Sequence, residues 1–159
     1  PEMIAVRSIL FDKNEKENWS VVWHQALTIA VTSRIEVNGY GPWSMKDGFP
    51  HVQPTRRLLE HMVTIRLHLD DTPSLNGALR VIPESHLLGK IPTIGVAKHA
   101  SAPETICECL AGDVLLMKPL ILHASRRSES SSSQTQRRRV IHIEYARDSD
   151  LHSSLRWAE

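Results

Sequence analysis

The sequence predicts an all-β protein, built as a sandwich or barrel of short strands. Three observations lead to this prediction. Apolar and β-branched residues recur in short runs along the chain, polar or glycine- and proline-containing stretches separate these runs, and apolar residues at helical spacing occur once. We therefore expect about eight strands with a single short helix among them.

The expected strands can be placed in order by their residue types. Residues 4–11 form the first, and residues 19–31 form a continuously apolar extended block whose two faces are both covered. Residues 38–54 hold several glycines and prolines and predict a long ordered loop without regular structure. A short helix is expected over residues 55–62. The later strands are expected at residues 63–69, 78–82, 106–110, 114–117, 121–125 and 138–145.

Two of these strands alternate in polarity. In residues 63–69 the side chains of Thr64, Arg66 and His68 share one face, which we expect to be a polar inner face. In residues 138–145, Arg138 and His142 share a face while the intervening isoleucines form an apolar face. The serine run at residues 128–133 cannot be buried and predicts a surface loop between strands.

Composition restricts the functional class. The chain has 159 residues, enough for one domain over residues 1–159, and 41% of them are hydrophobic. A formal net charge of +1 gives no overall field for nucleic acid or a membrane surface, and no apolar run is long enough to span a bilayer. Cys107 and Cys109 lie too close in sequence for a ready disulfide, so we expect reduced thiols and a cytoplasmic location.

Two histidines stand inside strand-like segments. A histidine in an apolar strand is by itself more often structural than a ligand. The interpretation changes when three segments are taken together: residues 23–31, 112–125 and 138–145, which read WHQALTIAV, GDVLLMKPLILHAS and RRVIHIEY. Together they resemble the phytanoyl-CoA dioxygenase family of iron(II)/2-oxoglutarate oxygenases.

The resemblance covers the chain from Ile9 to Trp157 and implies a double-stranded β-helix, a jelly roll of the cupin-like kind with few short helices. It implies Fe(II) and 2-oxoglutarate as cofactors and a small molecule as substrate, hydroxylated at an unactivated carbon. The family domain normally begins earlier than Pro1, so we expect part of its N-terminal region to be missing. Substrate identity and oligomeric state are not set by the resemblance.

The metal site departs from the family pattern, which places His-x-Asp on one strand and a distal histidine on another. His24 and His123 match the two histidines, but Ala26 stands at the carboxylate position. Three interpretations remain open: an oxygenase whose third ligand is water or another carboxylate, an aliphatic halogenase with chloride in the vacated position, or an inactive β-sandwich binding protein. None of Asp47, Asp70 and Asp113 is directed at the metal by the sequence.

The cosubstrate pocket matches the family more closely. Arginine presents two parallel donors to a carboxylate, and the resemblance assigns Arg138 to the distal carboxylate of 2-oxoglutarate. Gln25 and Ser125 match positions that line the cosubstrate in relatives. We expect Arg66 and His68 on the inner strand face, and Trp43 in the 38–54 loop, to line the substrate pocket.

Overall fold

A computed structural model describes residues 2–129 and 137–158 of the chain. The predicted serine loop falls largely on residues 130–136, outside the described part. In chain order the elements are β1 (Met3–Lys13), β2 (Val21–His24), β3 (Ile29–Ala30), β4 (Trp43–Lys46), β5 (Phe49–Val52), α1 (Arg56–His61), β6 (Val63–His68), η1 (Ser74–Asn76), β7 (Leu79–Val81), η2 (Ser85–Leu88), α2 (Thr93–His99), β8 (Thr105–Cys107), β9 (Val114–Met117), β10 (His123–Ser125), β11 (Arg138–Arg147) and η3 (Asp148–Asp150).

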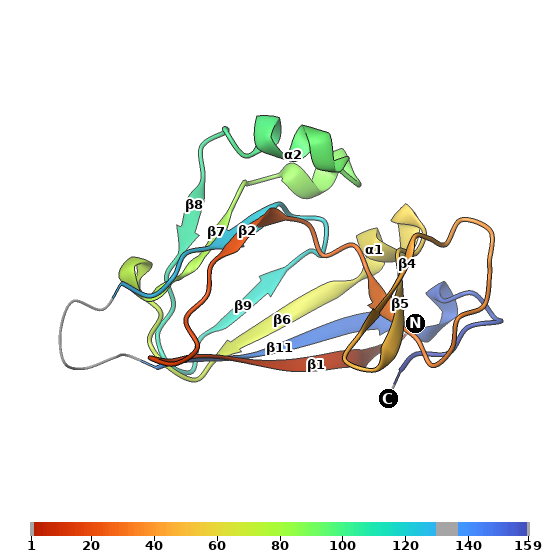
Figure 1. Ribbon diagram of the computed structural model, residues 1–159, viewed down its shortest axis with the longest axis horizontal. Helices are drawn as coiled ribbons and strands as arrows, with labels where there is room; N and C mark the ends of the chain where they lie inside the picture. The colour runs from red at the N-terminus through yellow and green to blue at the C-terminus, as the bar shows by residue number, and fades with distance from the viewer. Residues whose placement is uncertain (1, 130–136, 159) are drawn as a thin grey trace.

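Two four-stranded sheets form the body of the molecule. One has the strand order β1-β11-β6-β9 and the other β2-β10-β7-β8, and every strand pairing among the described residues is antiparallel. In Figure 1 the first sheet is the lower layer, with β2, β7 and β8 above it and α2 above those strands. From β6 onward the chain passes back and forth between the sheets, which is the double-stranded β-helix. The predicted fold class is confirmed.

The hydrophobic core lies at the end of the molecule where α1 and the small β3-β5-β4 sheet close the two layers (Figure 1). Leu58 and Leu59 of α1 are fully buried there against Ile29 and Val52. Thr55 caps this helix by accepting a hydrogen bond from the Leu58 amide at 3.4 Å. A smaller apolar cluster of Leu79, Val81 and Met117 lies between β7 and β9, and buried polar side chains of β6 and β11 occupy a further part of the space between the sheets.

The polar inner faces predicted for two strands are present. Thr64, Arg66 and His68 are the buried residues of β6, and the buried residues of β11 start with Arg138 and alternate through His142. The two strands pair in register, so that His142 lies opposite Arg66. Charged and imidazole groups from neighbouring strands therefore gather on one surface between the sheets.

The outer face of the lower sheet is apolar. Cross-strand pairing places Leu10, Ile141, Leu67 and Val114 in one row across all four strands, and its two edge residues are more than half exposed. A second row contains Ser8, Ile143, Ile65 and Leu116.

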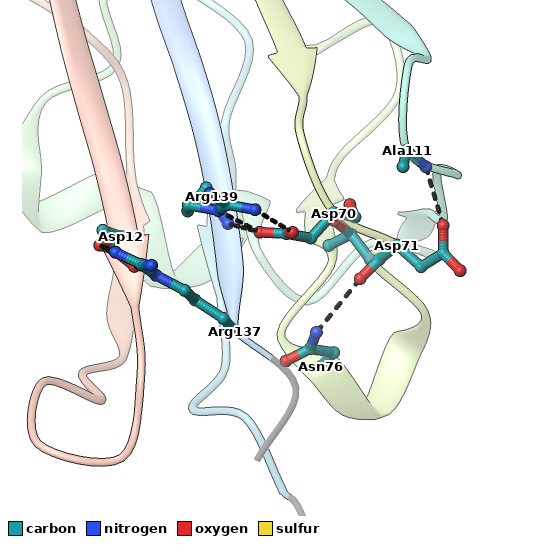
Figure 2. A network of polar contacts seen from close by, with 8 residues as sticks. Asp12, Asp70, Asp71, Asn76, Ala111, Arg137 and Arg139 are labelled. Carbon is teal, nitrogen blue, oxygen red and sulfur yellow. Dashed lines mark hydrogen bonds and ion pairs between the residues drawn. The ribbon is translucent and has the colours of Figure 1, made fainter. Parts of the chain in front are cut away.

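Charged pairs border this face at one end of the strands. Arg139 donates to Asp70 from Nε at 2.9 Å and from Nη2 at 2.7 Å. Figure 2 shows this pair beside Arg137, which donates to Asp12. Asp71 accepts from the Ala111 amide in the same view. Arg139 is thus taken up by an ion pair outside the sheets, as its position in the alternation predicts.

Three expectations about local structure were wrong. Residues 38–54 are not one irregular loop: they contain the β4–β5 hairpin, whose two-residue turn is Asp47-Gly48. This Asp-Gly pair is a strong hairpin signal because both residues adopt positive φ, here 51° and 81°. The block at residues 19–31 is split between β2 and β3 in different sheets, and α2 is an additional helix.

The two cysteines, Cys107 and Cys109, are free thiols. Across the described residues, no helix has the length and apolarity required to cross a membrane.

Candidate active site

Two histidines face each other across neighbouring strands. His24 ends β2 and His123 begins β10, and the two residues are register partners. Their ring centroids lie 4.2 Å apart with the planes inclined at 51°. The residues that the sequence predicts as metal ligands, far apart along the chain, are therefore brought together by the sheet.

The hydrogen bonds of both rings fix which nitrogen is available. His24 Nδ1 lies 2.9 Å from the Val22 carbonyl oxygen, and His123 Nδ1 lies 2.8 Å from that of Ile121. A carbonyl oxygen only accepts, so Nδ1 carries the proton in each ring and Nε2 holds the free electron pair. This arrangement, with a backbone carbonyl orienting each imidazole, is the one that metal-binding histidines show.

Burial keeps His123 neutral. Desolvation, followed by the neighbouring His24, lowers the pKa of His123 to about 3. A metal needs the unprotonated imidazole, and a ring with this pKa supplies it throughout the physiological range. The chemistry of this pair therefore fits a divalent transition metal.

Among the described residues, no third protein ligand lies beside the pair. Ala26 lines the same cavity as both rings, and its amide is bonded to the Pro119 carbonyl oxygen at 2.9 Å. In the described residues, no group of three His, Cys, Asp or Glu side chains is arranged to hold a metal. Asp70 is paired with Arg139, and Asp113 accepts from the Leu110 amide. The chain thus offers two imidazoles and an alanine methyl where the family has a carboxylate.

The histidine pair opens on a cavity of about 420 Å³ between the sheets. A volume of this order holds a small molecule together with a short dicarboxylate. Its described lining residues are Arg7, Ile9, Phe11, Trp19, Val21, His24, Gln25, Ala26, Leu27, Thr28, Lys46, Gln53, Arg66, Leu79, His123, Ala124, Ser125, Arg138, His142 and Glu144.

Three buried cations lie in or beside this cavity. Arg138 is 3% exposed, Arg66 6% and Lys13 1%. Lys13 and Arg138 are register partners on β1 and β11. Across the residues that the structure describes, none of the three makes an ion pair with a carboxylate. Burying unneutralised charge is costly, so this cluster is organised to receive an anion.

The pKa values of these three cations are lowered by burial and, for Lys13 and Arg66, by their positive neighbours. Burial lowers the pKa of Arg138 to about 10, and burial with the nearby Arg138 lowers that of Arg66 to about 10. Burial, Arg138 and Arg66 together lower the pKa of Lys13 to about 7. Arg138 donates Nη1 to the Gly77 carbonyl oxygen, and its buried Nε has no partner in the described chain.

Ser125 and Gln25 have different surroundings. Ser125 is buried and accepts a hydrogen bond from Lys13 Nζ at 3.4 Å, so it belongs to the cationic end of the cavity. The Gln25 amide nitrogen donates to the Gly89 and Leu120 carbonyl oxygens at 2.8 and 2.6 Å, and its oxygen accepts from the Ile91 amide at 2.7 Å. Gln25 therefore holds the chain around the site together, and its contact with a cosubstrate stays a prediction.

The three predicted substrate-pocket residues are not together. Arg66 lines the cavity and donates to His142 Nδ1 at 3.1 Å. His68 is buried further along β6, bonded to Thr72 Oγ1 at 2.9 Å, and Trp43 packs against the hydrophobic core. Neither His68 nor Trp43 is among the described lining residues of the cavity. Their contact with a substrate remains untested.

The sequence interpretation missed Lys13, Arg7 and Glu144. Lys13 follows Ile9 and Phe11 at a spacing of two, and Glu144 follows Arg138, Val140 and His142 at the same spacing. Extending the alternation of both strands would have placed Lys13 and Glu144 on the inner face. The signal was present, but the polar character of Lys13 suggested a turn.

A double-stranded β-helix with a histidine pair between its sheets is the architecture of the non-haem iron and 2-oxoglutarate oxygenases. The chain belongs to the phytanoyl-CoA dioxygenase (PhyH) family, whose model matches residues 3–139. None of the curated proteins is similar enough in sequence to match.

Solved structures share the fold at low sequence identity. EctD from S. alaskensis, in its apo form, is 18% identical with a TM-score of 0.64, and the alignment covers 94% of this chain and 46% of that one. AviO1 from Streptomyces viridochromogenes Tue57 is 24% identical with a TM-score of 0.61, covering 92% and 52%. SnoN, a non-haem α-ketoglutarate-dependent epimerase of nogalamycin biosynthesis, is 17% identical with a TM-score of 0.59, covering 90% and 46%. The chain spans about half the length of these proteins.

Proposed function

We propose that the protein is an Fe(II)/2-oxoglutarate-dependent oxygenase that hydroxylates an unactivated carbon of a small molecule. The observation that supports this most strongly is the presence, on one cavity, of two facing imidazoles and of two buried arginines, Arg66 and Arg138, that have no carboxylate partner among the described residues. A structure of EctD holds 2-oxoglutarate and 5-hydroxyectoine in the same fold, with a TM-score of 0.63 and 18% identity. Membership of the family adds to this support.

Each group of residues has a role in the proposal. His24 and His123 would hold the metal through Nε2. Arg138 would bind the distal carboxylate of 2-oxoglutarate, since its guanidinium is buried at the cavity and its Nε–H is unpartnered among the described residues. Lys13 and Ser125 lie beside it and reinforce the preference for an anion. When bound, the metal and cosubstrate would supply hydroxylation of a C–H bond with dioxygen as the oxidant, one oxygen atom entering the product and the other entering succinate, which is released with carbon dioxide.

Ala26 leaves a second candidate reaction. The methyl group lines the same cavity as both imidazoles and carries no charge, so a chloride ion could take the position that a carboxylate has in the family. The protein would then be an aliphatic halogenase. A water molecule at this position leaves the oxygenase reaction. High chloride with hydroxylated product alone would exclude the halogenase, and a chlorinated product would establish it.

An anaerobic spectroscopic titration tests the proposal. Iron(II) and 2-oxoglutarate added together should produce a visible charge-transfer absorption that neither produces alone, saturating at one equivalent per chain. His123→Ala should abolish this absorption, and Arg139→Met, on the opposite face of the same strand, should leave it unchanged. A native chain without the absorption would favour the third interpretation, an inactive binding protein.

Ala26→Asp separates that inactive protein from an enzyme with an altered site. Succinate formation gained or increased in this variant would show that the pocket is competent and that only the third ligand is missing. No succinate, even with the carboxylate restored, would support a binding module. The free thiols of Cys107 and Cys109 support a reducing compartment, the cytoplasm, as the place of this activity.

A further inference from the structure

The end of the cavity away from Arg138 holds a buried carboxylate that accepts no hydrogen bond from the described residues. Glu144 is 6% exposed and lines the cavity. Its Oε1 lies 3.9 Å from Arg7 Nη1 and 3.4 Å from His142 Nε2, and no hydrogen bond of the described residues ends on this carboxylate. Buried carboxylates in folded proteins normally accept hydrogen bonds, so Glu144 has acceptor capacity directed at the cavity and unused by the described chain.

The side chains next to Glu144, His142 and Arg7, have partners of their own that orient them. Arg66 can only donate, so His142 Nδ1 accepts its hydrogen bond and the neutral ring carries its proton on Nε2, facing Glu144. Arg7 also lies within ion-pair distance of Asp47, at 3.7 Å, and lines the cavity itself. Glu144 and Arg7 therefore present an acceptor and a donor side by side to whatever occupies this end.

We propose that Glu144 and Arg7 form the substrate-docking pair and that they receive a hydroxyl group of a polyhydroxylated small molecule. This inference rests on the proposed oxygenase function and names its substrate class. A hydroxyl is both donor and acceptor. A hydroxyl oxygen about 2.8 Å from both Glu144 Oε1 and Arg7 Nη1 fits between these two atoms, which are 3.9 Å apart, and the angle Oε1–oxygen–Nη1 is then roughly 90°.

The charge balance of the cavity selects a neutral hydroxyl over a cation. Glu144 is the one acidic side chain among the described lining residues, whereas Arg7, Lys46, Arg66 and Arg138 are basic. A substrate ammonium group would meet this surplus of positive charge. Thr28 and Gln53, which also line the cavity, add further neutral hydrogen-bonding groups suited to hydroxyls.

The docking pair is separate from the cosubstrate end. Glu144 and Arg138 lie six residues apart on the same face of β11, which is about 20 Å at the rise of a strand. His142, which lies near enough to His123 to lower its pKa, stands on β11 between Arg138 and Glu144. A substrate held at Glu144 therefore does not compete with 2-oxoglutarate for Arg138.

Saturation-transfer NMR on the full chain with zinc(II) and 2-oxoglutarate tests the proposal without turnover. Three probes share one six-carbon ring: myo-inositol, cyclohexylammonium and cyclohexanecarboxylate. We expect transfer to myo-inositol above the other two, and at least a tenfold loss of its affinity in both Glu144→Gln and Arg7→Met. Glu104→Gln, which changes an acid paired with Arg80 outside the cavity, should have no effect.

The 2-oxoglutarate signals in the same samples separate the two hypotheses. Retained 2-oxoglutarate binding in Glu144→Gln shows that the variant is folded and that the cosubstrate site is independent. Absence of 2-oxoglutarate binding in the native chain would defeat the proposed function instead. The docking proposal is overturned by native affinity for myo-inositol in Glu144→Gln, by preference for cyclohexylammonium, or by no transfer to myo-inositol in the native chain.

Discussion

Replacing Arg138 by methionine separates stability from cosubstrate binding, because this residue should affect the two in opposite directions. Its pKa falls from an ordinary 12.5 to about 10 through burial. Each pKa unit corresponds to about 1.4 kcal/mol, so keeping this guanidinium charged costs the fold about 3 kcal/mol. The sign follows from a base with a depressed pKa: the cost is present in full below pH 10 and is relieved above it.

Methionine removes that cost and fills much of the same volume. The variant also loses the hydrogen bond to the Gly77 carbonyl, worth about 1 kcal/mol. We therefore expect the free protein to gain about 2 kcal/mol in its free energy of unfolding, which raises the Tm by roughly 4–8 °C in a domain of this size. Thermal unfolding followed by circular dichroism measures the shift.

The same variant should bind 2-oxoglutarate poorly. Removing one partner of a buried charge pair costs about 3 kcal/mol, or roughly a 100-fold increase in Kd measured by calorimetry. Arg139→Met is the matched control: its guanidinium is paired with Asp70 on the other face, so its loss should change stability by less than about 1 kcal/mol and leave Kd unchanged. A less stable Arg138→Met, or one with native affinity, would refute the anion-site reasoning.

Three further predictions concern other residues. The affinity for 2-oxoglutarate should fall by up to tenfold per pH unit above about pH 7, since Lys13, with a pKa of about 7, then loses the proton that favours an anion. Calorimetry at several pH values should show a flatter dependence of Kd on pH in Lys13→Met. The same dependence in native chain and variant would exclude Lys13 from cosubstrate binding. The free fold should gain stability over the same range, because an unfolded lysine keeps its proton to higher pH. Ala26→Asp should tighten zinc(II) binding by at least tenfold, because it places a carboxylate beside the two imidazoles; equal affinity in a competition titration would show that this position does not face the metal. Thr55→Ala should lower the free energy of unfolding by about 1 kcal/mol through loss of the α1 cap, with no effect on ligand binding; chemical denaturation measures this, and no loss would mean that the cap is not stabilising.

The sequence was most informative where one strand face is buried. The period of two in β6 and β11 placed Arg66, His142 and Arg138 inside, and the structure has them there. Burial of one face fixes the register of a strand, because a shift of one residue would move every side chain to the other face. The local sequence pattern was therefore sufficient to predict which face of the strand these side chains occupy.

Features that depend on distant pairing could not be derived in the same way. The contact between His24 and His123 requires β2 to pair with β10 from the far part of the chain. Resemblance to a family supplied that link, whereas no local rule does. The Glu144 and Arg7 pair likewise depends on the register of β1 against β11, which a β-bulge between Ala5 and Arg7 alters.

The central claim is that His24 and His123 bind one metal ion while Arg138 binds the cosubstrate across the same cavity. Crystals soaked anaerobically with Fe(II) and 2-oxoglutarate test it directly through iron anomalous density. We predict a single strong peak within bonding distance of both Nε2 atoms and a carboxylate on the Arg138 guanidinium. Iron bound elsewhere, or the two imidazoles without metal while 2-oxoglutarate occupies another site, would contradict the account.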